Sequence, residues 1–184
     1  PRLGLPDGAL DLTSVFGRQA PQVLEIGSGY GAAAVAYCTT FPAHDLVAVD
    51  VHRPGMARAA AAAAEAALPN LRLHLGDAVP LLDRLPARSL AALHLFFPDP
   101  WPKTKHEKRR FVCADRLALL LDRLVDGGAL LVATDQPGYA DFLRRQARHL
   151  GADVELSGRP TWRPLEGFEH KAVTAGRPII DLRV

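Results

Sequence analysis

Short apolar runs alternate with helical patterns along the chain, and this alternation limits the possible folds more than any other feature. We expect strands at 22–26, 46–50, 71–75, 90–96, 129–134, 154–156 and 178–182. Several of these runs are apolar throughout, as strands are when helices cover both faces of a parallel sheet. The pattern therefore predicts an α/β fold of the doubly wound, Rossmann-like type, with a mostly parallel seven-stranded sheet and helices on both faces.

Helices are expected between these strands, at 30–39, 54–67, 79–85, 107–124 and 139–150. Pro54 and Pro80 stand near helix starts, where a missing backbone N–H is tolerated. Gly127 and Gly128 follow the fourth helix, where a glycine stop is expected. The polar stretch 157–176 has no regular pattern, and long irregular connections in compact domains are usually functional.

The length of 184 residues suits one domain with one sizeable core. No repeat or composition shift divides the chain, so we expect one domain over 21–184, preceded by an N-terminal remnant or helix over 1–20. Because Pro1 rather than Met opens the chain, we expect an original N-terminal segment to be missing. No apolar surface stripe demands a partner, which leaves a monomer and a homodimer as alternatives.

The sequence lacks the roughly 18 consecutive apolar residues of a membrane helix, and no secretory signal opens it. We therefore expect a cytoplasmic protein without a membrane partner. Cys38 and Cys113 lack the spacing of a redox or metal motif, so they are expected to be buried free thiols. No metal is expected.

A basic segment at 103–110 holds five Lys or Arg side chains and one acid. Its positive charge is suited to binding phosphates of RNA, although a solvated helix start is the simpler interpretation. The expected phosphate contacts are Lys103, Lys105, Lys108, Arg109 and Arg110. Three further cations in the fifth helix either extend this surface or form a solvated helix face: Arg144, Arg145 and Arg148.

A glycine loop follows the first expected strand. Gly27, Gly29 and Gly31 permit positive φ and let the backbone approach a ligand closely, and open α/β sheets bind ligands at this edge. We expect these three glycines to contact a cofactor. The spacing also fits a loose dinucleotide fingerprint, which is weak evidence alone.

Carboxylates occur at three successive strands. Asp50 is placed to accept both ribose hydroxyls of an adenosine, and Asp77 ends the third strand. Glu25 is costly in an apolar strand unless it is paired, and the ammonium group of S-adenosylmethionine is a suitable partner. The alternatives are that Asp77 caps the following helix and that Glu25 binds loop amides. Together the three acids favour a methyl donor over a nicotinamide cofactor.

A proline-rich loop follows the fourth strand. Pro98, Pro100 and Pro102 fix φ and push the preceding residues towards extended conformations, so Asp99 lies on a stiff loop beside Trp101. An acid held next to an aromatic surface suits a pocket for a nucleobase. A rigid turn with a solvent-exposed acid is the alternative.

The block 96–103, Phe-Phe-Pro-Asp-Pro-Trp-Pro-Lys, with the basic residues after it, resembles the bacterial tRNA (guanine-N7)-methyltransferase family. The likeness continues in the family's order at 24–31, 49–55, 76–78, 133–135, 168–169 and 176–182. It covers nearly the whole chain from about residue 21. The glycine loop is generic to class I methyltransferases, whereas the Pro-Asp-Pro-Trp block is specific.

This resemblance implies transfer of a methyl group from S-adenosylmethionine to N7 of a guanine in tRNA, at position 46 of the variable loop. By the same resemblance, the donor contacts are Glu25, Asp50, Asp77 and Asp99, and Asp99 is also catalytic. The substrate contacts match Lys103, Asp135, Glu166, Gly167, Phe168 and Glu169, beside the basic Lys108 and Arg109. Glu166 replaces the family's usual threonine, so that the hydroxyl is lost and a negative charge is added at this contact.

Three other functions stay open at this stage. The protein could be another class I N-methyltransferase that acts on a different RNA, a protein or a small molecule, but the basic segment disfavours the last two. A nicotinamide-dependent oxidoreductase is disfavoured because no suitable catalytic set follows a strand. A non-catalytic RNA-binding module is disfavoured because the cofactor acids are all present.

Overall fold

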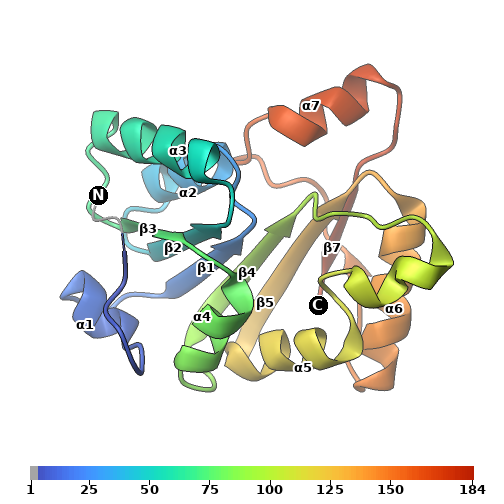
Figure 1. The fold of residues 1–184 in the computed structure, drawn as a ribbon, viewed down its shortest axis with the longest axis horizontal. Coiled ribbons are helices and arrows are strands. Elements are labelled where there is room, and N and C mark those ends of the chain that lie inside the picture. The colour runs from blue at the N-terminus through green and yellow to red at the C-terminus, as the bar shows by residue number, and fades with distance from the viewer. Residues whose placement is uncertain (1–3) are drawn as a thin grey trace.

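The computed structural model describes residues 4–184, apart from the side chain at position 104. Its strands form one sheet in the order β3-β2-β1-β4-β5-β7-β6. β1 to β5 pair in parallel, and β7 is antiparallel to both β5 and β6. The predicted doubly wound, mostly parallel seven-stranded sheet is confirmed (Figure 1). The strands are β1 (Gln22–Ile26), β2 (Asp45–Asp50), β3 (Leu71–Leu75), β4 (Leu90–Phe96), β5 (Leu124–Thr134), β6 (Glu155–Leu156) and β7 (Ile180–Arg183).

Helices cover both faces because successive strand residues point to opposite sides. In β1, Val23 belongs to the core beneath α2 and α3, whereas its neighbour Leu24 belongs to the core beneath α4, α5 and α6. The helices are α1 (Leu12–Phe16), α2 (Ala32–Thr40), α3 (Arg53–Glu65), α4 (Ala78–Arg84), α5 (Ala114–Arg123), α6 (Pro137–His149) and α7 (Gly167–Thr174), with a 3-10 helix η1 (Thr104–Arg109) before α5. The arrow of β4 points to the side on which α7 lies (Figure 1).

The strand order reverses at β1, which pairs with β2 on one side and with β4 on the other. Ile26 is in register with both Val49 and Leu95. The loops that leave these three strands therefore start at the same level of one sheet edge. Ligands of open α/β sheets bind at such a reversal.

Two predictions about the fourth helix and its end were wrong. The single helix predicted at 107–124 is divided into η1 and α5, because the chain becomes extended at Arg110, whose side chain turns into the protein. Gly127 and Gly128 do not end a helix but lie inside β5. A Cβ at Gly128 would lie 3.0 Å from the carbonyl oxygen of Val125 and 3.1 Å from that of Ala91, so the glycine allows close backbone contact beside an irregularity in the β4–β5 pairing.

The stretch 157–176, predicted to be irregular, contains the helix α7. Few apolar residues mark this helix, and only Glu169 and Ala172 of it are buried. Its anchor is a set of ion pairs, described below, that periodicity does not reveal. Of the predicted N-terminal segment 1–20, residues 1–3 lie outside the described part, and α1 falls within the rest.

Substitution of Gly31 tests how closely the glycine loop packs on α3. Gly31 has φ +80°, and a Cβ there would lie 2.5 Å from that of Ala59. We expect Gly31→Ala to lower the free energy of unfolding by about 1–3 kcal/mol, because the contact is overpacked and the backbone is strained. Gly138→Ala, in α6 with open space around it, should be neutral or stabilise by about 0.4–1 kcal/mol. Urea unfolding midpoints measure both, and equal midpoints would contradict the expectation.

Candidate active site

The glycine loop after β1 is open on one side and tightly packed on the other. Gly27, Gly29 and Gly31 all have positive φ, of 73°, 56° and 80°. A Cβ on Gly27 or Gly29 would meet nothing within 4 Å, whereas one on Gly55 of α3 would lie 2.4 Å from the carbonyl oxygen of Gly29. The start of α3 therefore supports a loop whose other side has space for a ligand.

Asp50 holds this loop to the end of β2. Its Oδ2 accepts a hydrogen bond from the backbone N–H of Gly29 at 2.6 Å, and its Oδ1 accepts one from His52 at 2.7 Å. The carboxylate is half-buried at the sheet edge. It thus orders the loop, and a ribose that binds Asp50 would share its oxygens with these amides.

Asp77 lies exposed after β3, where its Oδ1 accepts from the backbone N–H of Val79 at 2.9 Å. It is the N-cap of α4, as the alternative interpretation of the sequence expected. Oδ2 has no partner within residues 4–184. The cap fixes the carboxylate and leaves one oxygen for a ligand.

Glu25 lies inside β1 and is only 2% exposed. Its Oε2 is 3.5 Å from Nδ1 of His94 in β4, and this oxygen has no hydrogen-bond partner in the described chain. Glu25 therefore does not bind loop amides through that oxygen. A buried carboxylate without a partner is costly, and this unsatisfied oxygen fits a site for a cationic group.

His94 was not predicted from the sequence, although a histidine inside an otherwise apolar strand was a signal. Its ring is completely buried, and neither nitrogen has a hydrogen-bond partner among the described residues. It stacks on Phe96 and on Trp162, with ring centroids 5.2 Å away in both cases. Trp162 comes from the long connection before α7, which thus covers the side of the sheet that holds Glu25.

Asp99 is exposed, three residues beyond β4 and at the same sheet edge as the glycine loop. Arg110 fixes the loop of Asp99 by donating to the carbonyl oxygens of Pro100, at 3.0 Å, and of Trp101, at 3.1 Å. Phe97 and Trp101 have φ of 50° and 40°, which is strained for bulky residues. The loop therefore holds Asp99 in a defined place.

The prediction that Arg110 contacts phosphate was wrong. Its side chain is buried, and it also donates to Glu107 and to the carbonyl oxygen of Gly138. Five hydrogen-bond donors suit Arg to such a clamp. Three neighbouring cations remain exposed, and they are Lys103, Lys105 and Lys108.

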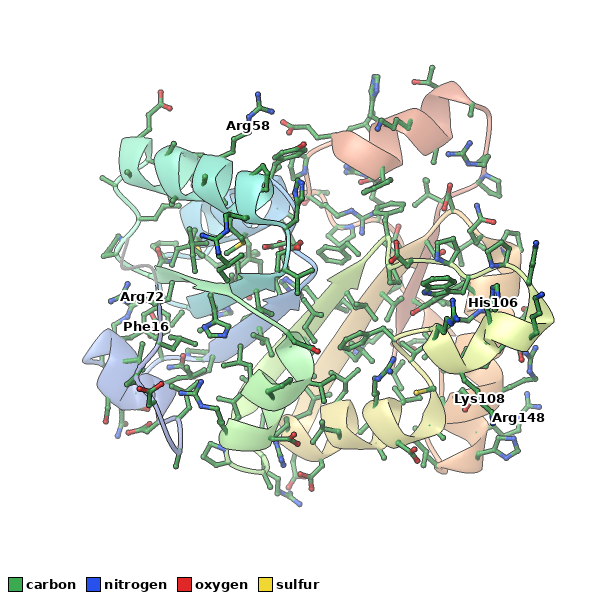
Figure 2. The ribbon with its side chains drawn as sticks, viewed as in Figure 1. Phe16, Arg58, Arg72, His106, Lys108 and Arg148 are labelled. Carbon is green, nitrogen blue, oxygen red and sulfur yellow. The ribbon has the colours of Figure 1, made fainter. Side chains whose placement is uncertain are left out.

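The exposed Arg109 packs on the half-buried Trp101. The Arg109 guanidinium lies 4.9 Å from the centre of the Trp101 ring, and His106 meets that ring edge-on at 5.7 Å. Figure 2 shows His106, Lys108 and Arg148 on one side of the molecule. In α6, Arg144 and Arg145 form ion pairs with Asp141 and Glu107, respectively.

The remaining predicted substrate contacts differ in their exposure. Glu166 and Gly167 are exposed at the start of α7, and Phe168 is 70% exposed. Asp135 already accepts from Arg177 at 2.7 Å. Glu169 does not face a substrate, because it is 2% exposed and is paired with arginines inside the protein.

A buried arginine anchors α7 to the sheet. Arg163 is 3% exposed and donates to both Glu169 and Asp181 of β7. Arg159 donates to Glu169 as well, at 2.6 Å. Burial acts to raise the pKa of Glu169, but the hydrogen bonds and charges of Arg163 and Arg159 outweigh it, so that this pKa lies below the usual value of 4.5.

The sheet order and the loops at its edge define the class of protein, because this is the fold of class I, S-adenosylmethionine-dependent methyltransferases. A 16S rRNA methyltransferase, KamB, shares the fold with a TM-score of 0.66 at 19% identity, over 96% of this chain and 93% of its own. The precorrin-6y C5,15-methyltransferase of Geobacter metallireducens has a TM-score of 0.63 at 12% identity, over 94% and 83% of the two chains.

Sequence comparison gives the family. Residues 19–182 match a family model described as "Putative methyltransferase". The tRNA (guanine-N7)-methyltransferase of Nitrosomonas europaea is 40% identical over 99% of this chain and 84% of its own. That of Mycobacterium bovis is 41% identical over 99% and 75%. The chain belongs to the tRNA (guanine-N7)-methyltransferase family, as the resemblance of the proline block predicted.

No helix within residues 4–184 is long and apolar enough to cross a membrane. That part of the chain also has no cluster of three or more His, Cys, Asp or Glu side chains that could hold a metal ion.

Acid should weaken the anchor of α7. Because the pKa of Glu169 is lowered in the folded protein, its ionised form stabilises the fold above the usual pKa near 4.5, and this contribution is lost as the pH falls through the lower, folded value. We expect Glu169→Gln to cost about 1.5–3 kcal/mol at pH 7 and to flatten the loss of stability below pH 4.5. Urea unfolding at several pH values measures this. Asp126→Asn, an exposed acid at the other sheet edge, should keep the wild-type slope, and a wild-type slope in Glu169→Gln would refute the role.

Proposed function

We propose that this protein transfers a methyl group from S-adenosylmethionine to N7 of a guanine in tRNA, and that the guanine is position 46 of the variable loop. The observation that carries the proposal is Asp99, an exposed acid on a clamped loop that leaves the same sheet edge as the glycine loop and also bears Trp101, over which Arg109 lies. The curated relatives at about 40% identity bear the name of this activity. Position 46 rests on the family resemblance alone.

The residues present fit the methyl donor. Glu25 would take the ammonium group, since its buried Oε2 lacks a partner among residues 4–184. The open glycine loop would lie along the donor, Asp50 would bind the ribose hydroxyls, and Asp77 would bind the adenine amino group through its free oxygen. When bound, the donor supplies a methyl carbon activated by a sulfonium.

Asp99 is proposed to orient the guanine. N7 carries a lone pair in the ring plane and no proton, so its methylation requires no general base. Asp99 can accept from the N1–H and the amino group of guanine and can offset the positive charge that develops on the methylated base. A donor contact of Asp99, which the family resemblance implies, stays part of the proposal.

Aromatic and basic side chains near the loop of Asp99 and on α7 would hold the RNA. Moving a base out of its stack costs about a few kcal/mol, and stacking on Trp101 or Phe168 would offset this cost. Lys103, Lys108 and Arg109 would bind phosphates and position the RNA without reading its sequence. Glu166 and Gly167 are proposed to contact the RNA next to Phe168.

Two carboxylates of the predicted substrate set are proposed to act indirectly. Glu169 anchors α7 through Arg163 and Arg159, and thereby places Phe168. Asp135 is paired with Arg177 at the end of β5, where it would shape the pocket edge. Membership of a methyltransferase family sets aside the nicotinamide-dependent alternative.

Nucleoside analysis tests the reaction. Bulk tRNA incubated with the protein and methyl-labelled S-adenosylmethionine should yield labelled 7-methylguanosine, which maps to position 46 after nuclease digestion. Calorimetry should detect binding of S-adenosylmethionine and not of NAD. Label in another nucleoside would overturn the proposed target, and label at another guanine would overturn only the position.

Removal of the Asp99 carboxylate should abolish methylation and preserve much of the donor binding. We expect Asp99→Ala and Asp99→Asn to lower kcat by about 10²-fold or more, as loss of one oriented charge-stabilising group does. Asp83→Asn, an exposed acid on α4, is the matched control and should retain full activity. Full turnover in Asp99→Ala would reject its assignment.

A further inference from the structure

Three aromatic side chains in the site region each have a cationic side chain next to the face of the ring. Arg109 lies over Trp101 at 4.9 Å, and Lys171 lies over Phe168 at 5.5 Å. The third ring is Tyr30 of the glycine loop, which has Arg58 of α3 at 5.2 Å. The first two pairs belong to the proposed RNA surface. The third pair, Tyr30 and Arg58, has no part in the proposed function.

Close backbone packing holds Tyr30 and Arg58 together. Gly31 and Ala59 approach so closely that a Cβ on the glycine would overlap that of the alanine. Their neighbours in the chain, Tyr30 and Arg58, are thereby brought side by side, and His52 meets the Tyr30 ring edge-on at 5.8 Å. The backbone contact between the glycine loop and α3 therefore determines that Tyr30 and Arg58 are neighbours.

Both side chains remain available to a partner. Tyr30 is 53% exposed, and Arg58 is exposed on α3. Most other arginines form ion pairs, but neither Arg58 nor the nearby exposed Arg53 has a carboxylate partner in the described part of the chain. An open ring beside an unneutralised cation is the combination with which proteins bind single-stranded nucleic acid.

We propose that Tyr30 and Arg58 form a second RNA contact on the α3 side of the active site, with an unpaired base stacked on Tyr30 and a phosphate bound by Arg58. This inference rests on the proposed function. In Figure 2, Arg58 projects from α3 at the top of the molecule, where α7 also lies. His106 and Lys108 of η1 lie on the right of the same view. An RNA strand that contacts both η1 and α3 would cross the sheet edge from which the glycine loop and the loop of Asp99 both leave.

Binding of tRNA as a function of salt tests the contact. Arg58→Gln should weaken binding several-fold and lower the slope of log K against log salt by about 0.7–0.9, the value of one phosphate contact. Tyr30→Ala should weaken binding about tenfold with little change in slope, and Tyr30→Phe should retain wild-type affinity because its ring still stacks. Calorimetry with S-adenosylmethionine should give wild-type donor affinity in all three variants.

Arg88→Gln is the charge-matched control, because Arg88 lies at the opposite end of the sheet. It should leave the salt slope unchanged. Wild-type tRNA affinity and slope in Arg58→Gln would overturn the inference, and that variant alters only an exposed helix position, so it should fold. Loss of donor affinity with unchanged tRNA binding in Tyr30→Ala would also overturn it and would place the pair in the donor pocket.

The proposed function fails on a different observation. If the unaltered protein makes no 7-methylguanosine in tRNA, the proposed reaction is wrong, whatever the binding variants show. If it makes 7-methylguanosine and Arg58→Gln keeps the full salt slope, only the second RNA contact is wrong.

Discussion

Parallel pairing of β1 with β2 and with β4 is the constraint on which the active site depends. Because all three strands run in the same direction and in register, the glycine loop, Asp50 and the loop of Asp99 leave the sheet at one edge. The strand order also reverses at β1, with helices α2 and α3 on one face and α4, α5 and α6 on the other, and ligands of open α/β sheets bind at such a reversal. The acids of the site need no contact with each other to converge.

Buried arginines fix two segments that lie outside the sheet, the loop of Asp99 and helix α7. Arg110 holds the loop of Asp99 through backbone carbonyls, and Arg163 holds α7 through Glu169 and Asp181. Burial of these charges carries a desolvation cost, which the hydrogen bonds offset only when every donor is well placed. Such networks therefore tolerate few alternative arrangements, which suits the orienting role that is proposed for Asp99. Arg58 and Arg109 differ from these buried arginines, because each guanidinium stays in solvent and lies over an aromatic ring.

The three acids that are proposed to bind the cofactor differ in their surroundings. Asp50 is occupied by two backbone amides and so orders the loop before any ligand binds. Asp77 combines a helix cap with a free oxygen. Glu25 has a buried oxygen beside His94 that lacks a hydrogen-bond partner in the described chain.

The sequence by itself determined the sheet and the identity of the site. Strands 22–26, 71–75 and 90–96 were predicted with their observed bounds, because short runs rich in apolar residues between helical patterns identify the strands of an α/β sheet. The glycine loop, Asp50, Asp77 and Asp99 could be found from the sequence because each lies at or just after the end of a strand. The ends of parallel strands lie at the same edge of the sheet. Only the tertiary structure decided that Glu25 meets His94, that Arg110 turns inward and that α7 exists. Each of these depends on partners distant in sequence, such as Arg110 with Gly138 and Glu169 with Arg163 and Arg159. Local patterns show which residues are charged, but the path of the folded chain decides which of those charges are buried.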